Sequence, residues 1–219
     1  YEMTSSLVGS EMCIRDSSCT VGCPLFKGEI RMAYRNGTYI AFDGQGKTDP
    51  TQSDLKYLGL LRSWDKNSNF DFHFIDSHKK TAAVLDSSLR KTLENRLMER
   101  MRNSKNMLLV LSGETNYNRG LLNFEIEKAV DLYELPLIIA YTDCSHVINY
   151  DDYSIRWPKV LVDRVNDGSA NAIHIPFKKK AIIEALNRFS VNSTGSDILR
   201  GPDNVFSKEA YAQWGYYFS

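Results

Sequence analysis

The chain has 219 residues, of which 42% are hydrophobic and 25% charged, a balance typical of a soluble globular protein with one α/β domain and additional segments. Lys plus Arg and Asp plus Glu both number 27, so the net charge is zero and the basic stripe of a nucleic-acid binder is missing. No run approaches 18 apolar residues, which argues against a membrane span. We expect a cytoplasmic protein without nucleic-acid or membrane partners.

The cysteines give no support for a metal site. Cys13, Cys19 and Cys23 fall near the start of the chain, and only Cys144 comes later. Cys19 and Cys23 form a Cys-x3-Cys pair, but no second ligand pair with zinc-site spacing follows. We expect no bound metal and no disulfide, as is usual in the cytoplasm.

The first 31 residues differ in character from the rest. The opening "YEMTSSLVGSEMCIRDS" resembles a translated sequencing adapter, and "KGE" at 27–29 can be encoded by a bacterial ribosome-binding site at the usual distance before Met32. A signal peptide is the alternative, but "SSLVG" is too short and polar for its apolar region. We predict that residues 1–31 are a non-native or disordered extension and that Met32 is the true start.

From Met32 onward, apolar periodicity predicts alternating strands and helices. Phe70, Phe72 and Phe74 alternate at period two, whereas Leu93, Leu97 and Met101 recur at four-residue steps. Strands are predicted at 37–42, 70–76, 106–112, 135–143 and 172–177, and helices at 53–64, 87–104, 120–133 and 178–189.

This alternation predicts an α/β fold. Near-continuous apolar strands separated by helices favour a parallel sheet covered on both faces, and five β-α units make a flavodoxin-like doubly wound sheet the natural architecture, over residues 32–189. Ligands in such sheets bind outside the carboxyl ends of the strands. The loops "DGQGKTD", "DSHKK" and "GETNYNR" all fall at that end.

The segment after residue 189 has two parts. Residues 190–204 are polar and rich in helix and strand breakers, as in a linker. The last stretch carries six aromatic residues, whose large apolar surface favours contact with protein over solvent: Phe206, Tyr211, Trp214, Tyr216, Tyr217 and Phe218. We expect this tail to dock either on its own domain or on a partner.

The loop after the first strand is a candidate wall of a ligand cleft. It follows Phe42 and contains Asp43, Gly44 and Lys47, but it lacks both the Gly-Lys-Ser/Thr ending of a P-loop and the third glycine of a dinucleotide fingerprint. Asp43 also occupies the position of a response-regulator phosphoacceptor. That interpretation needs further acidic residues and a lysine at neighbouring strand ends, which are not clearly placed.

Two other positions have both a functional and a structural interpretation. Asp76 and His78 close the second strand, where His78 could donate to a phosphate, orient a carboxylate or simply cap the strand. Glu125 follows Leu121 by one helical turn and borders the apolar face of its helix. It is either a surface charge or a carboxylate held at the rim of a pocket.

Four segments in this order resemble the TIR-like domain of the Thoeris antiphage defence systems, within the Toll/interleukin-1 receptor superfamily. They are "TYIAFDG", "FHFIDSH", "NMLLVLSGETNYNRGLLNFEIEKAV" and "LPLIIAYTD". The resemblance covers residues 37–189. Its most specific element is the family's W-x-x-x-E-[IL] pattern, which places Leu121 at the aromatic position, Glu125 at the catalytic glutamate and Ile126 at the aliphatic position. Asp76 and His78 match an Asp-x-His of the same branch.

The resemblance implies cleavage of the bond between nicotinamide and ribose in NAD+, which is the substrate, with no separate cofactor. Glu125 would be the catalytic residue. The implied substrate-binding residues are Phe42, Asp43, Gly44, Lys47, Asp76, His78 and Leu121. The product would be either ADP-ribose or a cyclic ADP-ribose isomer that signals to an effector protein, with a homo-oligomer and a phage component as possible activators. A plain NAD+ glycohydrolase acting by depletion and a non-catalytic interaction module are the alternatives.

Overall fold

The computed structural model describes residues 35–43, 54–65, 74–75, 87–113 and 120–216. The chain divides into the units Tyr1–Arg31 and Met32–Ser219, and all described residues lie in the second unit. The predicted character of residues 1–31 therefore falls outside the described residues, as do four of the predicted site residues: Gly44, Lys47, Asp76 and His78.

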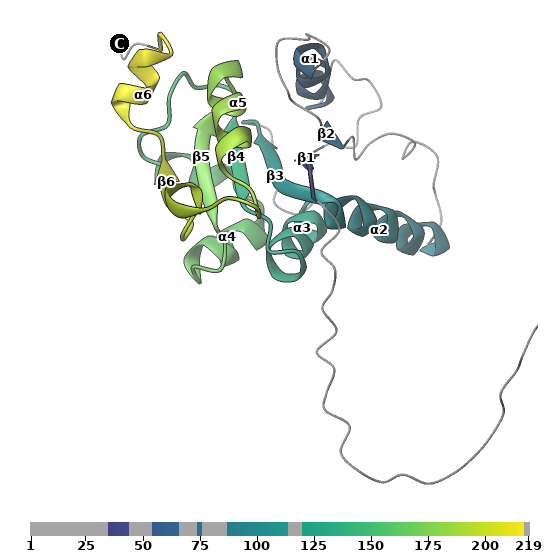
Figure 1. Ribbon diagram of the computed structural model, residues 1–219. Coiled ribbons are helices and arrows are strands. Elements are labelled where there is room, and N and C mark those ends of the chain that lie inside the picture. The colour runs from purple at the N-terminus through teal and green to yellow at the C-terminus, as the bar shows by residue number, and fades with distance from the viewer. Residues whose placement is uncertain (1–34, 44–53, 66–73, 76–86, 114–119, 217–219) are drawn as a thin grey trace, which may run out of the picture. The chain divides into compact units, whose positions relative to one another are not determined.

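The centre of the fold is an all-parallel sheet with the strand order β2-β1-β3-β4-β5-β6 (Figure 1). The first five strands are β1 Gly37–Phe42, β2 Phe74–Ile75, β3 Ser104–Leu111, β4 Leu137–Tyr141 and β5 Ala172–Pro176. Their order is that of the flavodoxin-like doubly wound fold, so the predicted five-stranded architecture is confirmed. A short sixth strand, β6 Asn204–Val205, was not predicted.

The helices fill the connections between the strands. They are α1 Leu55–Asp65, α2 Ser87–Arg102, α3 Gly120–Glu127, α4 Lys159–Asn166, α5 Lys179–Arg188 and α6 Lys208–Gln213. α3 continues directly into a π-helix, η1 Lys128–Leu132, and the two together form the predicted helix 120–133. Two 3-10 helices, η2 Asp151–Arg156 and η3 Gly195–Asp197, complete the set of helices among the described residues. Neither α4 nor α6 was predicted.

The strands bury opposite side chains on their two faces, as the period of two requires. In β1, Tyr39 and Ala41 join one core cluster, whereas Ile40 and Phe42 join the other. The first cluster contains residues of α2, α3 and α4, and the second contains residues of α1, α5 and α6. Figure 1 shows these two groups of helices on either side of the sheet. Each face of the sheet is thus covered by its own layer.

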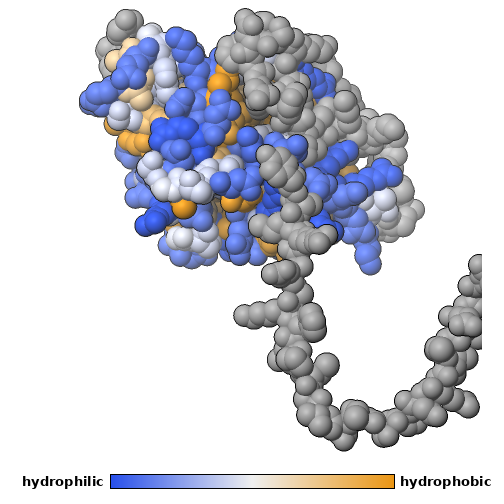
Figure 2. All heavy atoms as spheres, in the orientation of Figure 1, coloured by the Kyte–Doolittle hydropathy of each residue, from blue (hydrophilic) through white to orange (hydrophobic). Residues whose placement is uncertain are grey.

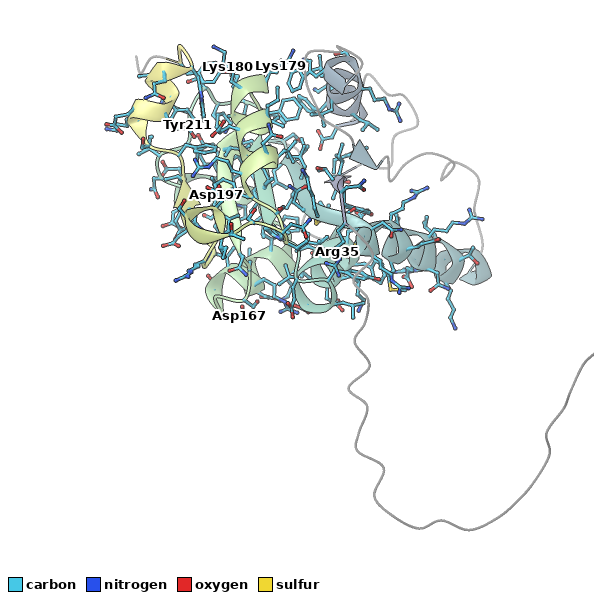
Figure 3. All side chains as sticks on the ribbon, viewed as in Figure 1. Arg35, Asp167, Lys179, Lys180, Asp197 and Tyr211 are labelled. Carbon is cyan, nitrogen blue, oxygen red and sulfur yellow. The ribbon has the colours of Figure 1, made fainter. Side chains whose placement is uncertain are left out.

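The described part of the aromatic tail packs on its own domain, whereas Tyr217 and Phe218 lie outside the described residues. β6 pairs with β5 through Ile173 and Asn204. Phe206 is 5% exposed, and the ring of Tyr211, which comes from α6 (Figure 3), is fully buried in the same cluster as the residues of α5. The hydroxyl of Tyr211 donates to the carbonyl of Val147, 3.2 Å away. Of the two predicted docking modes, the structure shows the one on the chain itself.

The surface is described only in part. On the face in Figure 2, the described residues are mostly hydrophilic, and hydrophobic ones form small separate areas. None of the helices among the described residues is long and apolar enough to cross a membrane.

Candidate active site

Glu125 lies in the middle of α3 and is almost completely buried. Its side chain is 3% exposed, although Leu121, one turn earlier on the same helix, is 39% exposed. Carboxylates are rarely buried to this degree without a specific partner, because burial removes the water that stabilises their charge. The interpretation of Glu125 as an ordinary surface charge is therefore wrong.

The sequence of α3 explains why Glu125 points inward. Leu122, Ile126 and Ala129 are buried at helical spacing in the cluster beneath α2 and α3. Glu125 follows Leu122 by three residues and directly precedes Ile126, so it belongs to the inward-facing side of the helix. Glu127, two residues further, is half-exposed and pairs with Lys128 at 2.7 Å. Two neighbouring glutamates of one helix thus have opposite environments.

The partner of Glu125 is a tyrosine on the sheet. The hydroxyl of Tyr39 donates a hydrogen bond to Oε1 of Glu125, and the Tyr39 side chain is fully buried. Tyr39 belongs to β1, where it lies in register with Ile75 of β2 and Met107 of β3. Because strands pair on both sides of β1, the backbone that carries the phenol is held in place. This contact joins residues 86 positions apart in the sequence.

The surroundings of Glu125 change its acidity. Burial raises the pKa of Glu125 from 4.5 to about 7, while the hydrogen bond from Tyr39 and the positive charge of Arg100 on α2 act in the opposite direction. The carboxyl group therefore exchanges its proton near neutral pH. A perturbed pKa at a buried acid is typical of functional sites, although structural networks also produce it.

The carboxyl end of β1 has further buried acidic groups. Asp43, which directly follows β1, is 4% exposed, and Asp54, just before α1, is 2% exposed. The hydroxyl of Ser112, which directly follows β3, donates to Oδ2 of Asp54 at 3.2 Å. Since β1 and β3 are parallel neighbours, these groups lie at the edge of the sheet where ligands bind in this fold. Asp54 and Ser112 were not predicted as site residues.

The predicted binding residues are not gathered at one place among the described residues. Phe42 packs in the cluster on the α1 and α5 side of the sheet, whereas Glu125 lies on the α2 and α3 side with Tyr39. Leu121 is half-exposed on α3. Their roles in substrate binding stay predictions. Tyr39 and Arg100, which do act on Glu125, were missed, because no local pattern marks a tyrosine in an apolar strand as the partner of a distant glutamate.

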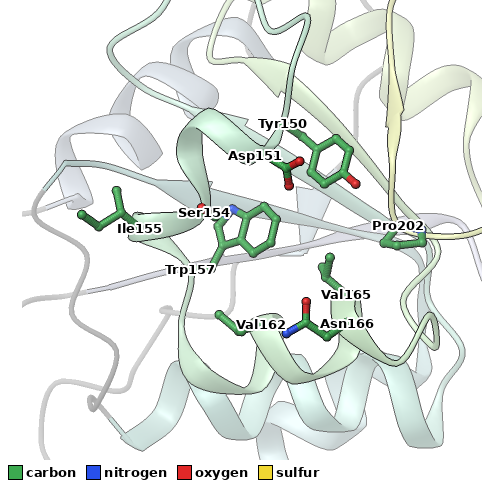
Figure 4. Close-up of a pocket in the computed structure, with 9 residues that line it drawn as sticks. All are labelled: Tyr150, Asp151, Ser154, Ile155, Trp157, Val162, Val165, Asn166 and Pro202. Atoms are coloured by element: carbon green, nitrogen blue, oxygen red, sulfur yellow. The ribbon is translucent and has the colours of Figure 1, made fainter.

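A pocket of about 650 Å³ lies elsewhere, against η2 and α4 (Figure 4). The rings of Tyr150 and Trp157 beside it are nearly parallel, with centroids 6.1 Å apart. The lining residues are Tyr150, Asp151, Ser154, Ile155, Trp157, Val162, Val165, Asn166 and Pro202. None of them is a predicted site residue, and the pocket does not include Glu125.

A buried hydrogen-bonded chain lies next to this pocket. Trp157 Nε1 donates to the Tyr141 hydroxyl, which lies 2.8 Å from His174 Nδ1, and His174 Nε2 lies 2.8 Å from the carbonyl of Pro202. A carbonyl can only accept, so Nε2 carries the proton and the Tyr141 hydroxyl donates to Nδ1. Burial lowers the pKa of His174 to about 4. The chain of bonds joins β4, β5 and the segment before β6.

The fold and the site define a class of protein: a doubly wound α/β domain with a buried acid on the helix that follows its third strand. Residues 39–146 match the family model of the TIR-like domain of the Thoeris protein ThsB. This segment is therefore a TIR-like domain of the Thoeris type, and the chain is a TIR-type protein of antiphage defence. The match begins at Tyr39 within β1 and extends past β4, so it includes both Tyr39 and Glu125.

Proposed function

We propose that the protein cleaves NAD+ at the bond between nicotinamide and ribose and that Glu125 is the catalytic residue. The observation that carries this proposal is the buried Glu125 carboxylate, which accepts a hydrogen bond from Tyr39. Stability alone is a weak explanation for a buried acid, because an apolar residue of similar volume usually stabilises the fold at least as well. Chemistry explains a buried glutamate at this place in a TIR-like domain better than stability does.

The reaction suits a single carboxylate. The C1′–N bond breaks with its electron pair moving to the nicotinamide nitrogen, which loses its positive charge, so departure needs no general acid. The ribosyl carbon then carries oxocarbenium-like positive charge, as in glycoside hydrolysis. A carboxylate fixed in a site of low polarity stabilises that charge more strongly than water does. Attack by water releases ADP-ribose and a proton, whereas attack by a nucleophile of the same nucleotide closes a ring and also releases a proton.

We propose further that the product is a cyclic ADP-ribose type messenger that activates an effector protein in the cytoplasm. A homo-oligomer and a phage component are the proposed activators. NAD+ enters as the substrate, and the proposal requires no cofactor. Depletion of NAD+ by simple hydrolysis remains the nearest alternative, because both routes begin with the same bond cleavage.

A non-catalytic interaction module is the alternative of a different class. The half-exposed Leu121 favours it, since an aliphatic side chain on the surface of α3 stands where the family usually has an aromatic one. Such a module would act through assembly alone and would not consume NAD+.

Incubation of the full chain with NAD+, followed by mass analysis of the products, tests these proposals. We expect free nicotinamide together with a nucleotide that is lighter than ADP-ribose by the mass of one water molecule, because ring closure adds no water to the ribosyl carbon. ADP-ribose alone would favour depletion. The absence of nicotinamide at high protein concentration would contradict the enzymatic proposal and favour the interaction module.

A further inference from the structure

Tyr39 is the described residue with the most direct influence on Glu125. Its hydroxyl, on β1, donates a hydrogen bond to Oε1 of Glu125 on α3. A phenol at neutral pH is a donor, and an ionised carboxylate is only an acceptor, so this bond is formed best when Glu125 is ionised. The bond fixes one of the two carboxylate oxygens and the direction of a side chain that has three rotatable bonds.

We propose that Tyr39 is a positioning residue: its hydroxyl holds Oε1 of Glu125, which favours the ionised form of the carboxylate and leaves Oε2 to face the ribose. This inference rests on the proposed function. Tyr39 does not touch the substrate in this account, and it acts only through Glu125.

The rigidity of Tyr39 suits this role. The residue is fully buried in one cluster with Ala41 and residues of α2 and α3, and its strand β1 pairs with β2 on one side and β3 on the other. A tyrosine side chain has two rotatable bonds, so little freedom remains once its ring is packed. The hydroxyl is therefore a fixed point against which the flexible glutamate is oriented.

The groups around Glu125 also indicate that Tyr39 favours the ionised carboxylate. Burial favours the neutral carboxylic acid of Glu125, and the two described groups that oppose this effect are Tyr39 from β1 and Arg100 from α2. On α3 itself, Glu127 is half-exposed and paired with Lys128. Loss of the Tyr39 hydroxyl therefore leaves the charge of Arg100 as the remaining described influence that favours ionisation.

Tyr39→Phe tests the proposal, with Tyr211→Phe as the matched control. Tyr211 is equally buried and its hydroxyl also makes a hydrogen bond, but it lies in the cluster on the other face of the sheet. We expect kcat/KM of the full chain for NAD+ to rise with pH around a midpoint near 7. In Tyr39→Phe the midpoint should move up by about one pH unit, with a loss of about fivefold at pH 7 that is recovered at high pH. Tyr211→Phe should leave the midpoint unchanged.

A second measurement keeps the test independent of activity. In the chain with Glu125, Tyr39→Phe should lower the thermal stability more strongly as the pH rises through 7. In the chain that carries Glu125→Gln, the effect of Tyr39→Phe on thermal stability should be the same at every pH. An unshifted activity midpoint, or the same pH dependence in both backgrounds, would overturn the proposal and leave Tyr39 with a packing role. If no NAD+ is cleaved at all, the proposed function fails, and the stability measurement still decides whether Tyr39 controls Glu125.

Discussion

At the scale of single residues, two glutamates two positions apart on α3 show how strongly the environment decides a role. Glu127 is half-exposed and paired with Lys128, whereas Glu125 is buried against Tyr39. Burial makes the charged form of Glu125 less stable, so its ionisation costs folding free energy. A cost in stability at one residue is what a functional site often shows.

We predict that Glu125→Gln stabilises the fold above pH 7. The pKa of Glu125 is higher in the folded chain than in the unfolded one, so the folded state binds more protons between pH 4.5 and about 7 and loses stability as pH rises through that range. Gln removes the ionisation, and the gain should reach at most on the order of 3 kcal/mol at pH 8 and vanish near pH 4. Chemical unfolding at several pH values measures it. A variant that is less stable than wild type at pH 8 would count against a buried, destabilising charge.

How far the sequence predicts this site depends on the distance between the residues involved. Helical periodicity placed Glu125 beside the apolar face of its helix, and the family pattern selected it over Glu127. Neither could show that the carboxylate is covered, because its burial depends on Tyr39, which is 86 positions away. The buried contact between Asp54 and Ser112 could not be predicted for the same reason, because these residues are 58 positions apart in the sequence.

At the scale of elements, the sheet was predictable because its strands are apolar and nearly continuous, and β1 to β5 were found at the expected places. The less regular elements were not. The π-helix η1 keeps the helical pattern while widening one turn, so the sequence does not distinguish it from the rest of the helix. The two residues of β6 are too few to show a period. α4 was missed because its eight residues are too few for a clear period.

The buried hydrogen bonds between β4 and β5 lead us to predict that the fold loses stability at low pH. The pKa of His174 is lower in the folded chain than in the unfolded one, so the unfolded state binds more protons between pH 4 and 6.5, and the contribution of His174 to stability is lost as pH falls through that range. The loss should approach about 3 kcal/mol below pH 4.

His174→Gln tests this acid effect. Gln can still donate to the carbonyl of Pro202 and accept from Tyr141, but it does not take up a proton. The fall in unfolding free energy between pH 6.5 and 4 should be smaller in this variant, whereas His146→Gln, outside the chain of bonds, should behave like wild type. Equal slopes for all three proteins would show that His174 is not the acid-sensitive group.

At the scale of the whole molecule, residues 39–146 form a TIR-like domain of the Thoeris type, and the C-terminal segment packs on the same sheet. β6 extends the sheet, and Phe206 and Tyr211 are buried with residues of α5. Polar composition suggested a linker at residues 190–204, but composition alone could not show that the aromatic residues beyond it would be packed against the sheet.

We predict that a chain beginning at Met32 folds like the full one. Residues 1–31 have no periodic pattern, and the unit that holds all described elements begins at Met32. The melting temperature and the far-ultraviolet circular dichroism per folded domain should be unchanged. A drop of more than a few degrees on deletion would show that the first 31 residues stabilise the fold.

We also predict that NAD+ turnover per molecule rises with protein concentration. Glu125 is only 3% exposed, so substrate can reach it only after a rearrangement, and assembly with further copies would provide the energy for one. Initial rates over a wide range of concentration, read beside the mass distribution in solution, measure this dependence. Rapid turnover at high dilution, with no such dependence, would contradict a site completed by assembly.

The most direct test of the central claim is the rate of nicotinamide release by Glu125→Gln beside Glu127→Gln and the unaltered chain. Gln keeps the shape and most of the hydrogen bonding of Glu125 but removes the charge that stabilises the ribosyl cation, a loss of roughly 3 to 4 kcal/mol or about a hundred- to a thousandfold in rate. The account predicts this loss for Glu125→Gln with the fold intact, and a change of no more than a few-fold for Glu127→Gln. Wild-type cleavage by Glu125→Gln, or an inactive Glu127→Gln, would contradict it.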